Sequence, residues 1–360
     1  MRRLLEWTVL VPGLAIVALA LTWGGDPGAV LVGVVAVLLA GSVLAAVHHA
    51  EVVAHRVGEP FGSLVLAVAV TVIEVGLIVT LMISGGSESA TLARDTVFAA
   101  LMISTTGIVG LSLLVGARRY GVAMFNAEGS GAALATVTTL ATLSLVLPTF
   151  TTSEPGPEFS PGQLTFAALA SLTLYATFVM TQTVRHRDFF LPVAQEGVPG
   201  EDEHATPPTN RATLTSLGLL LVALVAVVGL AKVESPAIEE AVAAAGFPPS
   251  FVGVVIAMLV LLPETLAAVR AARLGRLQTS LNLAYGSSIA SIGLTIPTIA
   301  LASVWLEGPL VLGLGPVQMV LLGLTVVVSV LTVVPGRATR LQGGVHLVLL
   351  AAFVFLAINP

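Results

Sequence analysis

The sequence predicts an all-α polytopic membrane protein with eleven transmembrane helices, one extra N-terminal helix followed by two inverted five-helix repeats. Three observations predict this fold class: an apolar composition, eleven long apolar runs, and a similarity between the two halves of the chain. Of 360 residues, 56% are hydrophobic and 10% are charged, and the mean hydropathy is +1.01. Because soluble domains carry roughly a quarter charged residues, a soluble globule and a disordered chain are excluded.

The composition also excludes several classes of function. The net charge of −5 is too small to indicate a polyanionic partner, so we expect no binding of nucleic acid. The chain has no Cys, which excludes disulfides, thiolate zinc sites and cysteine nucleophiles. The partner that the composition does indicate is the lipid bilayer, and it leaves the oligomeric state open.

Each predicted helix is an apolar run long enough to cross a hydrocarbon core of about 30 Å, which needs about 20 helical residues. The runs lack the polar and apolar alternation of membrane strands, and a lipid-facing backbone must satisfy its own N–H and C=O groups, so helices are expected. The first run lacks a small-residue cleavage site, so we expect a retained helix rather than a signal peptide. The runs cover residues 7–23, 29–50, 61–84, 97–116, 132–150, 162–184, 213–231, 250–269, 280–305, 309–334 and 341–358.

Arginine residues indicate the orientation. With a cytoplasmic N-terminus, the cytoplasmic loops hold thirteen Arg residues, whereas the outside holds only Arg94 and Lys232. This asymmetry follows the positive-inside rule and places the C-terminus outside. The thirteen are Arg2, Arg3, Arg56, Arg118, Arg119, Arg185, Arg187, Arg211, Arg270, Arg273, Arg276, Arg337 and Arg340.

The expected domain organisation has four parts. Residues 1–28 form the extra helix, 29–184 the first repeat, 185–212 a cytoplasmic acidic linker, and 213–360 the second repeat. The linker is rich in Pro and contains the acidic stretch Glu201–His204. We expect it to be a solvated tether, with a regulatory or cation-attracting segment as the alternative.

The two halves match in their polar residues. Glu74 and Glu264 occupy equivalent positions, and in the helix that follows each, Ser104-Thr105 aligns with Ser287-Ser288. Helices two to six then pair with helices seven to eleven. Because each unit has an odd number of spans, the second is inserted upside down relative to the first. Inverted repeats of this kind are typical of secondary transporters, whose sites lie near the midplane where the repeats meet.

Glu74 and Glu264 are the only Asp, Glu, Lys or Arg residues within the predicted spans. A charged side chain at the bilayer centre costs about 2.5–3.5 kcal/mol on insertion scales, and no basic residue in a span neutralises either one. Each must therefore be protonated or hold a cation. Two carboxylates suit one hard divalent cation or two protons. A protonated Glu that bonds to a neighbouring carbonyl is the purely structural alternative.

Calcium takes 6–8 oxygen ligands, so two carboxylates need supporting ligands. The candidates are neutral oxygens near the glutamates, although membrane Ser and Thr often bond back to their own helix instead. Asn282 has no counterpart in the first half, where Ala99 stands. The candidates are Ser104, Thr105, Asn282, Ser287, Ser288 and the backbone carbonyl of Leu259.

The Leu259 carbonyl is a candidate because of Pro263. Proline lacks an N–H, so it frees the carbonyl four residues earlier and should kink the helix beside Glu264. Irregular backbone at membrane depth is tolerated where it lines a cavity. The first repeat has Ile73 at the matching position, so opening there would rely on Gly76 or on distortion.

Glu59 and the histidines are not expected to be ligands in the glutamate site. Glu59 with Pro60 is expected to start a helix, with a cytoplasmic access point for cations as the alternative. His48, His49 and His55 are expected to pack at the interface rather than to sense cytosolic pH. His346 lies about a turn inside its helix, so we expect it to reach toward the membrane interface.

The sequence resembles the calcium/cation exchanger superfamily and, within it, the bacterial calcium/proton antiporters. The stretches that carry the resemblance are 58–62, 72–75, 262–264 and 282–289. It implies an exchanger core of ten helices in a bacterial inner membrane, with Glu74 and Glu264 as the shared cation and proton site. Many members have Pro-Glu in both repeats, whereas here the first repeat has Ile73-Glu74, and Ser288 stands where members carry Asn.

Together these observations lead to the hypothesis of a secondary antiporter that exports calcium in exchange for protons by alternating access. Sodium or potassium exchange for protons at the same glutamates is the alternative. An enzyme is disfavoured because no His-Glu-x-x-His or Gly-x-Ser-x-Gly motif occurs. We expect no cofactor; calcium ions and protons are the expected small partners.

Overall fold

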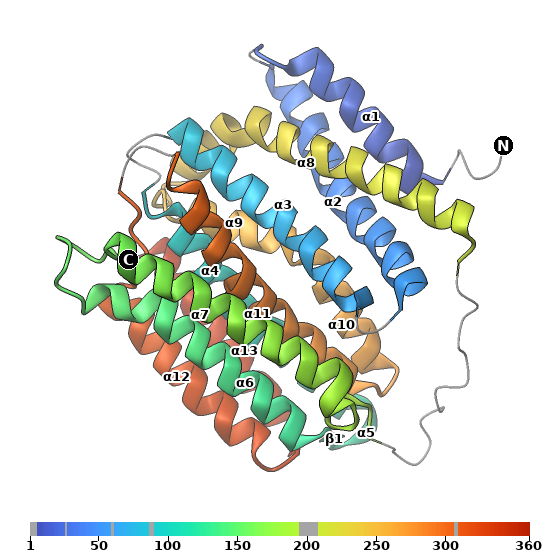
Figure 1. Ribbon diagram of the computed structural model, residues 1–360, viewed down its shortest axis with the longest axis vertical. Coiled ribbons are helices and arrows are strands. Elements are labelled where there is room, and N and C mark those ends of the chain that lie inside the picture. The colour runs from blue at the N-terminus through green and yellow to red at the C-terminus, as the bar shows by residue number, and fades with distance from the viewer. Residues whose placement is uncertain (1–5, 26, 59–60, 86–89, 194–207, 306–308) are drawn as a thin grey trace.

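The computed structural model describes the whole chain except residues 1–5, 26, 59–60, 86–89, 194–207 and 306–308. The described residues are almost entirely helical (Figure 1). The α-helices are α1 (Trp7–Thr22), α2 (Ala29–Val57), α3 (Phe61–Gly85), α4 (Leu92–Met102), α5 (Val109–Tyr120), α6 (Ala127–Ala141), α7 (Pro161–Met180), α8 (Asn210–Ala244), α9 (Phe251–Val260), α10 (Leu262–Arg273), α11 (Leu277–Ala302), α12 (Pro316–Val333) and α13 (Arg340–Ile358).

Short irregular turns extend or join several of these helices. The turns η3 (Ile103–Ile108), η4 (Thr142–Val146) and η6 (Thr181–Arg185) are π-helical, and η5 (Leu147–Thr149) and η7 (Arg187–Phe190) are 3₁₀-helical. The strands β1 (Ala123–Met124) and β2 (Arg337–Ala338) pair antiparallel. This small ladder ties the α5–α6 connection to the α12–α13 connection.

The helical membrane fold is confirmed. In the described part of the chain, nine helical spans are long and apolar enough to cross a membrane, and the bent pair α9 and α10 makes a tenth if it counts as one span. With 16 residues, α1 is about 24 Å long, shorter than a hydrocarbon core of about 30 Å. The count of eleven and the inverted-repeat arrangement therefore stay predictions.

The helices surround α11, which packs against α3, α6, α7 and α10 (Figure 1). On one side, α2 and α8 pack against each other and against α1 and α3. On the other side, α13 packs against α5, and α12 against α6. The central place of α11 brings residues from both halves of the chain to its surface.

Two clusters of buried apolar residues hold this arrangement together. The larger core is built mainly from α4 to α7 and α10 to α13, and the smaller core mainly from α1, α2, α3 and α8. Helix α9 contributes to both. Since Met82 and Phe251 pack against both clusters, the two cores meet along a shared seam.

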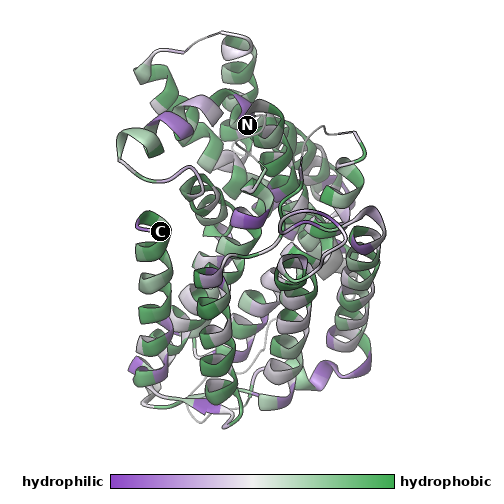
Figure 2. Ribbon diagram, turned by 90° about the vertical axis from the view of Figure 1, so that its left-hand side faces the viewer, coloured by the Kyte–Doolittle hydropathy of each residue, from purple (hydrophilic) through white to green (hydrophobic). Residues whose placement is uncertain are grey.

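The outward faces of the helices are apolar as well. Leu, Val and Phe side chains of α2, α7, α8, α12 and α13 are exposed, and Figure 2 shows that hydrophobic residues dominate along the helices, with hydrophilic residues at the lower edge of the bundle. A surface of this kind would be unstable in water, which agrees with a lipid environment.

The kink predicted from Pro263 is confirmed. Helix α9 ends at Val260 and α10 begins at Leu262, and the two are bent by 53°. Pro263 sits in the first turn of α10, where a missing N–H costs no intrahelical bond. The equivalent helix of the first repeat differs, because α3 runs unbroken past Glu74. The distortion in the first repeat lies instead at η3, one helix later.

Several helices extend beyond the predicted boundaries. Helix α2 reaches Val57 rather than residue 50, α4 begins at Leu92 rather than 97, and α8 reaches Ala244 rather than 231. Apolar periodicity marks the membrane-embedded part of a helix, whereas backbone hydrogen bonds continue past it into polar sequence. As a result, further acids lie in the helices, and Asp95 and Glu234 are buried.

Close packing of α4 on α9 gives a first prediction. A methyl group at Gly253 would lie 2.8 Å from the backbone nitrogen of Thr96 and 2.9 Å from the carbonyl carbon of Asp95. We expect Gly253→Val to lower the unfolding free energy by about 1–3 kcal/mol through overpacking, measured as a fall in the thermal unfolding midpoint in detergent. Gly323→Val is the matched control because a side chain at this exposed position of α12 meets nothing within 4 Å. Equal midpoints for both variants would contradict the packing.

Candidate functional site

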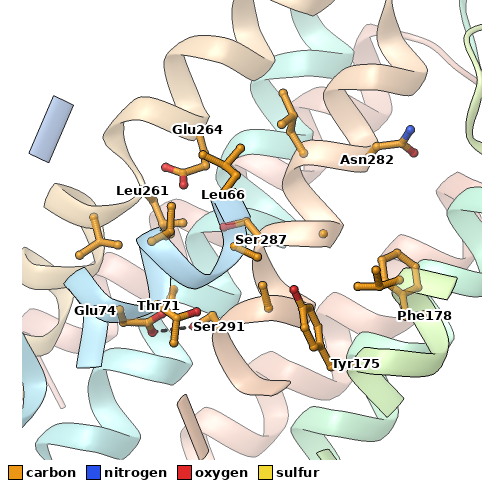
Figure 3. A pocket seen from close by; sticks show the side chains of 18 of the residues that line it. Leu66, Thr71, Glu74, Tyr175, Phe178, Leu261, Glu264, Asn282, Ser287 and Ser291 are labelled. Atoms are coloured by element: carbon orange, nitrogen blue, oxygen red, sulfur yellow. Dashed lines mark hydrogen bonds between the residues drawn. The ribbon is translucent and has the colours of Figure 1, made fainter. Parts of the chain in front are cut away.

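A cavity of about 220 Å³ lies between α3, α7, α10 and α11, and both Glu74 and Glu264 line it. Most of the lining is apolar, contributed by residues such as Leu66, Phe178 and Leu261. Figure 3 shows Glu264 on α10 and Glu74 on α3 at the same side of this pocket. The structure therefore brings together the two acids that the sequence singled out.

Glu74 is held by a bond to the second half of the chain. Its side chain is 3% exposed, and the Ser291 hydroxyl on α11 donates to its Oε1 at 2.6 Å (Figure 3). Because α3 is continuous here, the neighbouring backbone N–H groups are engaged in the helix, and a side-chain hydroxyl supplies the donor.

Glu264 is less constrained. It lies in the first turn of α10, just after the break at Leu261. Its Oε2 is fully buried and has no hydrogen-bond partner in the described structure. The carboxylates of Glu74 and, from α2, Glu51 act on it electrostatically. A buried, unpartnered carboxylate oxygen is costly, so this group requires a proton or a cation.

No basic side chain offsets these acids. Among the described residues that line the cavity, none is Lys, Arg or His. Nor do three or more His, Cys, Asp or Glu side chains converge anywhere in the described ranges. A metal ion in this cavity would thus be held by two carboxylates and by neutral oxygens.

Two of the predicted supporting residues line the cavity, Ser287 and Asn282. The Asn282 amide is already engaged: its Oδ1 accepts from Gln278 Nε2 at 2.9 Å, and its Nδ2 donates to the Phe190 carbonyl at 2.6 Å. Gln278 in turn accepts from the Asn126 backbone N–H at 2.7 Å. This chain of bonds fastens η7 and the start of α6 to α11 at the cavity wall.

The remaining predicted ligands lie elsewhere. Ser104, Thr105, Ser288 and Leu259 are not among the residues that line the cavity. The Thr105 hydroxyl donates to the Leu101 carbonyl, and the Ser288 hydroxyl to the Ala284 carbonyl. The Ser104 hydroxyl is buried without a partner. Glu59 and the acidic stretch Glu201–His204 lie outside the described residues.

Ser291 is the site residue that sequence reasoning missed. A signal for it existed, because Ser291 follows Ser287 by four residues and so shares its helix face. In the alignment of the two halves, its counterpart in the first repeat is Ile108, which has no hydroxyl. The two halves therefore differ: Glu74 has a donor from the other half, and Glu264 lacks the equivalent one.

The prediction for His346 was wrong. It does not reach the membrane interface but is fully buried, with Nδ1 3.0 Å from the Thr105 carbonyl and Nε2 3.2 Å from the Thr332 hydroxyl. A polar partner inside the bundle replaces the interfacial water that snorkelling would supply. His49 is buried too, with Nε2 3.0 Å from the Thr8 carbonyl, and joins α1 to α2.

A bundle of membrane-length helices with two acids in one apolar cavity is the construction of an integral membrane ion transporter. The chain belongs to the sodium/calcium exchanger protein family, which matches residues 27–184 and 215–359. The resemblance to cation exchangers drawn from sequence motifs is thereby confirmed.

Individual relatives match over nearly the whole chain. The protein y4hA of Sinorhizobium fredii is 45% identical, covering 98% of this chain and 96% of that protein. The sodium-potassium/proton antiporter ChaA of Escherichia coli is 34% identical, covering 97% and 95%. The structure of the H⁺/Ca²⁺ exchanger CAX has a TM-score of 0.70, with coverage of 98% and 91%. Its sequence identity is 16%, so this likeness concerns the fold.

The bond between Ser291 and Glu74 gives a second prediction. Ser291→Ala removes the O–H that holds the Glu74 carboxylate, and hydrogen bonds to charged groups contribute about 1.5–3 kcal/mol. We expect the cation concentration for half-maximal transport to rise roughly tenfold, measured in reconstituted vesicles. Ser288→Ala serves as the control because the hydroxyl of Ser288 bonds within its own helix. A larger effect from Ser288→Ala than from Ser291→Ala would reverse the assignment.

Proposed function

We propose that this chain is a cation/proton antiporter in which Glu74 and Glu264 form one site, occupied in turn by a cation and by protons. The observation that carries the proposal is that both carboxyl groups face the same buried cavity, which has no basic side chain among its described lining. Two acids in this setting are stable only when neutralised, and cations and protons are the two neutralising ligands.

The electrostatic cost of the empty site produces the coupling. Unpaired charges inside a membrane are unfavourable, so the site with both carboxylates ionised and no cation is the least populated state. The site therefore crosses the membrane loaded with a cation or with protons, and rarely empty. Exchange by alternating access follows if the site opens to only one side of the membrane at a time.

The two-repeat arrangement supports a site at the centre. The family matches in two separate stretches, which agree closely with the proposed repeats 29–184 and 213–360. The bond between Glu74 and Ser291 joins one stretch to the other. Sites at the repeat interface are typical of transporters with inverted repeats.

We further propose an orientation with the N-terminus in the cytoplasm of a bacterial inner membrane. The cavity extends from Glu74 to Gln182 in η6 and Thr279 near the start of α11. Arg185 and Arg276 lie close to these two positions in the sequence, and the positive-inside rule assigns that side to the cytoplasm. The cavity then connects the glutamates to the cytoplasmic side.

Calcium is the cation we propose from the chemistry of the site. Two carboxylates balance the charge of one divalent ion, and the cavity hydroxyls of Ser287 and Ser291 add hard oxygen ligands. Two protons per calcium ion is the simplest exchange that preserves this balance.

Sodium or potassium is the second candidate, favoured by the 34% identity to ChaA, a sodium-potassium/proton antiporter. One monovalent cation together with one proton neutralises the same two charges.

The test is proton flux in sealed vesicles that contain the purified protein and a pH-sensitive dye, with calcium, sodium and potassium added separately. We expect each transported cation to drive proton movement in the parent protein. Glu74→Gln and Glu264→Gln should each abolish it, because a neutral amide cannot exchange a proton for a cation. Glu128→Gln, at the exposed start of α6, is the control and should leave it unchanged. Cation-driven flux in either cavity variant would refute the shared site.

Competition between protons and the cation gives a further prediction. When both carboxyl groups are largely protonated, each cation has to displace protons, so acidification on the cavity side raises the half-saturating cation concentration. The rise should be about a hundredfold per pH unit for two displaced protons and about tenfold for one. Initial rates measured at several pH values distinguish the two stoichiometries. A half-saturating concentration independent of pH would exclude direct competition.

A further inference from the structure

The π-helical turn η3 leaves one backbone carbonyl without its helical donor. In an α-helix the Val109 N–H would bond to the Thr105 carbonyl. Here the Val109 N–H bonds instead to the carbonyls of Ser104 and Thr106, so the Thr105 carbonyl is passed over. Because Thr105 is buried, water does not replace the missing N–H, and an unsatisfied buried carbonyl is costly.

His346 supplies the missing donor. Its Nδ1 lies 3.0 Å from the Thr105 carbonyl oxygen, and since a carbonyl only accepts, Nδ1 must carry the hydrogen. The other ring nitrogen, Nε2, lies 3.2 Å from the Thr332 hydroxyl, which is also 2.8 Å from the Val328 carbonyl. One imidazole thus connects α13 to η3 on one side and to α12 on the other.

Two glycines place the imidazole at this carbonyl. A methyl group at Gly110 would lie 3.0 Å from His346 Cβ, and one at Gly343 would lie 2.9 Å from the Gly110 carbonyl oxygen and 2.7 Å from the Leu114 nitrogen. The backbones of α5 and α13 therefore touch directly at these positions. This contact leaves His346 little room to move away from η3.

The turn that His346 satisfies follows directly on α4, a helix that contributes to the wall of the candidate site. Ala100, in the same span as η3, lines the cavity beside the two glutamates. Helices α10 and α11, which carry Glu264 and Ser291, both pack against η3. In the second half, the position aligned with Thr105 is Ser288, where α11 continues as a regular helix. The first half alone therefore has a π-helical turn with a histidine donor at this position.

We propose that His346 is a positioning residue for cation exchange. Its Nδ1–H donates to the Thr105 carbonyl and thereby keeps the π-helical turn in place next to the cavity. The inference rests on the proposed function, since cation exchange is the reaction that it affects. It assigns no contact between His346 and the cation. Loss of the bond should let the turn relax toward a regular α-helix, which shifts Ala100 relative to α10 and α11.

Two substitutions separate the ring nitrogens. Asn places an amide N–H near the position of Nδ1, whereas Gln places one near Nε2. We expect His346→Asn to stay within about twofold of the parent half-saturating cation concentration, and His346→Gln to raise it at least about fivefold, as expected for the loss of one buried hydrogen bond. Thr332→Val should leave it unchanged, because the bond to Thr105 remains. His49→Asn is the matched control, since it removes another buried bond from histidine to a carbonyl, between α1 and α2 and away from the cavity.

Backbone hydrogen exchange of residues 101–112 supplies a readout that is independent of transport. The segment should exchange faster in His346→Gln than in the parent and His346→Asn. If His346→Gln does not fold, equal protection of the segment in the parent and in His346→Asn supports the proposal, and faster exchange in His346→Asn overturns it.

The transport measurements distinguish the two levels of the proposal. A parent protein without cation-driven proton flux refutes the proposed function itself. An active parent whose half-saturating concentration is the same in His346→Gln, or rises equally in His346→Asn and His346→Gln, refutes the role of Nδ1. A rise in His49→Asn equal to that in His346→Gln would show a general effect of instability instead.

Discussion

Two carboxyl groups in an apolar interior, with no basic side chain beside them in the described cavity, are the constraint on which this protein depends. An isolated buried acid in a membrane protein usually has a basic partner or is protonated, because burial of its charge opposes folding. Here the surrounding helices keep Glu74 buried and Glu264 half-buried, and in the proposed function cations and protons neutralise them. In the proposed function, the same penalty lowers the stability of the empty site and couples the passage of one ion to that of another.

The helices around the acids differ between the halves in ways that follow from a few residues. Pro263 breaks the helix before Glu264, whereas Ile73 lets α3 run straight past Glu74. Ser291 donates to Glu74, whereas Ile108 stands at the aligned position of the first half and leaves Glu264 without such a donor. A pair of similar acids is therefore held in two dissimilar environments. The acid that accepts from Ser291 and the acid whose Oε2 has no partner are not equivalent as ligands.

The helices, the two acids and the bend at Pro263 could be predicted from the sequence because each depends on local properties: apolar length, an isolated charge, and a missing N–H. The helix ends of α2 and α8 could not, since they continue beyond the apolar runs. The partners of side chains also escaped prediction. Ser104 and Thr105 were expected as ligands from their alignment, but neither lines the cavity, and the π-helical turn that contains them leaves no mark in the sequence pattern. The burial of His346 depends on contact between Gly110 and Gly343, which lie far apart in the chain.

The seam between the two apolar cores passes through the cavity. Glu74 follows Ile73 of the smaller core, while Ser291 lies between Ala290 and Ile292 of the larger one. The hydrogen bond between them thus connects the two packed cores. Any sliding of one core along the other has to stretch or break this hydrogen bond. If, as proposed, cations and protons alternate at the Glu74 carboxylate, the ligand bound there sets how freely the two cores slide, so a change at one side chain alters the packing of the whole molecule.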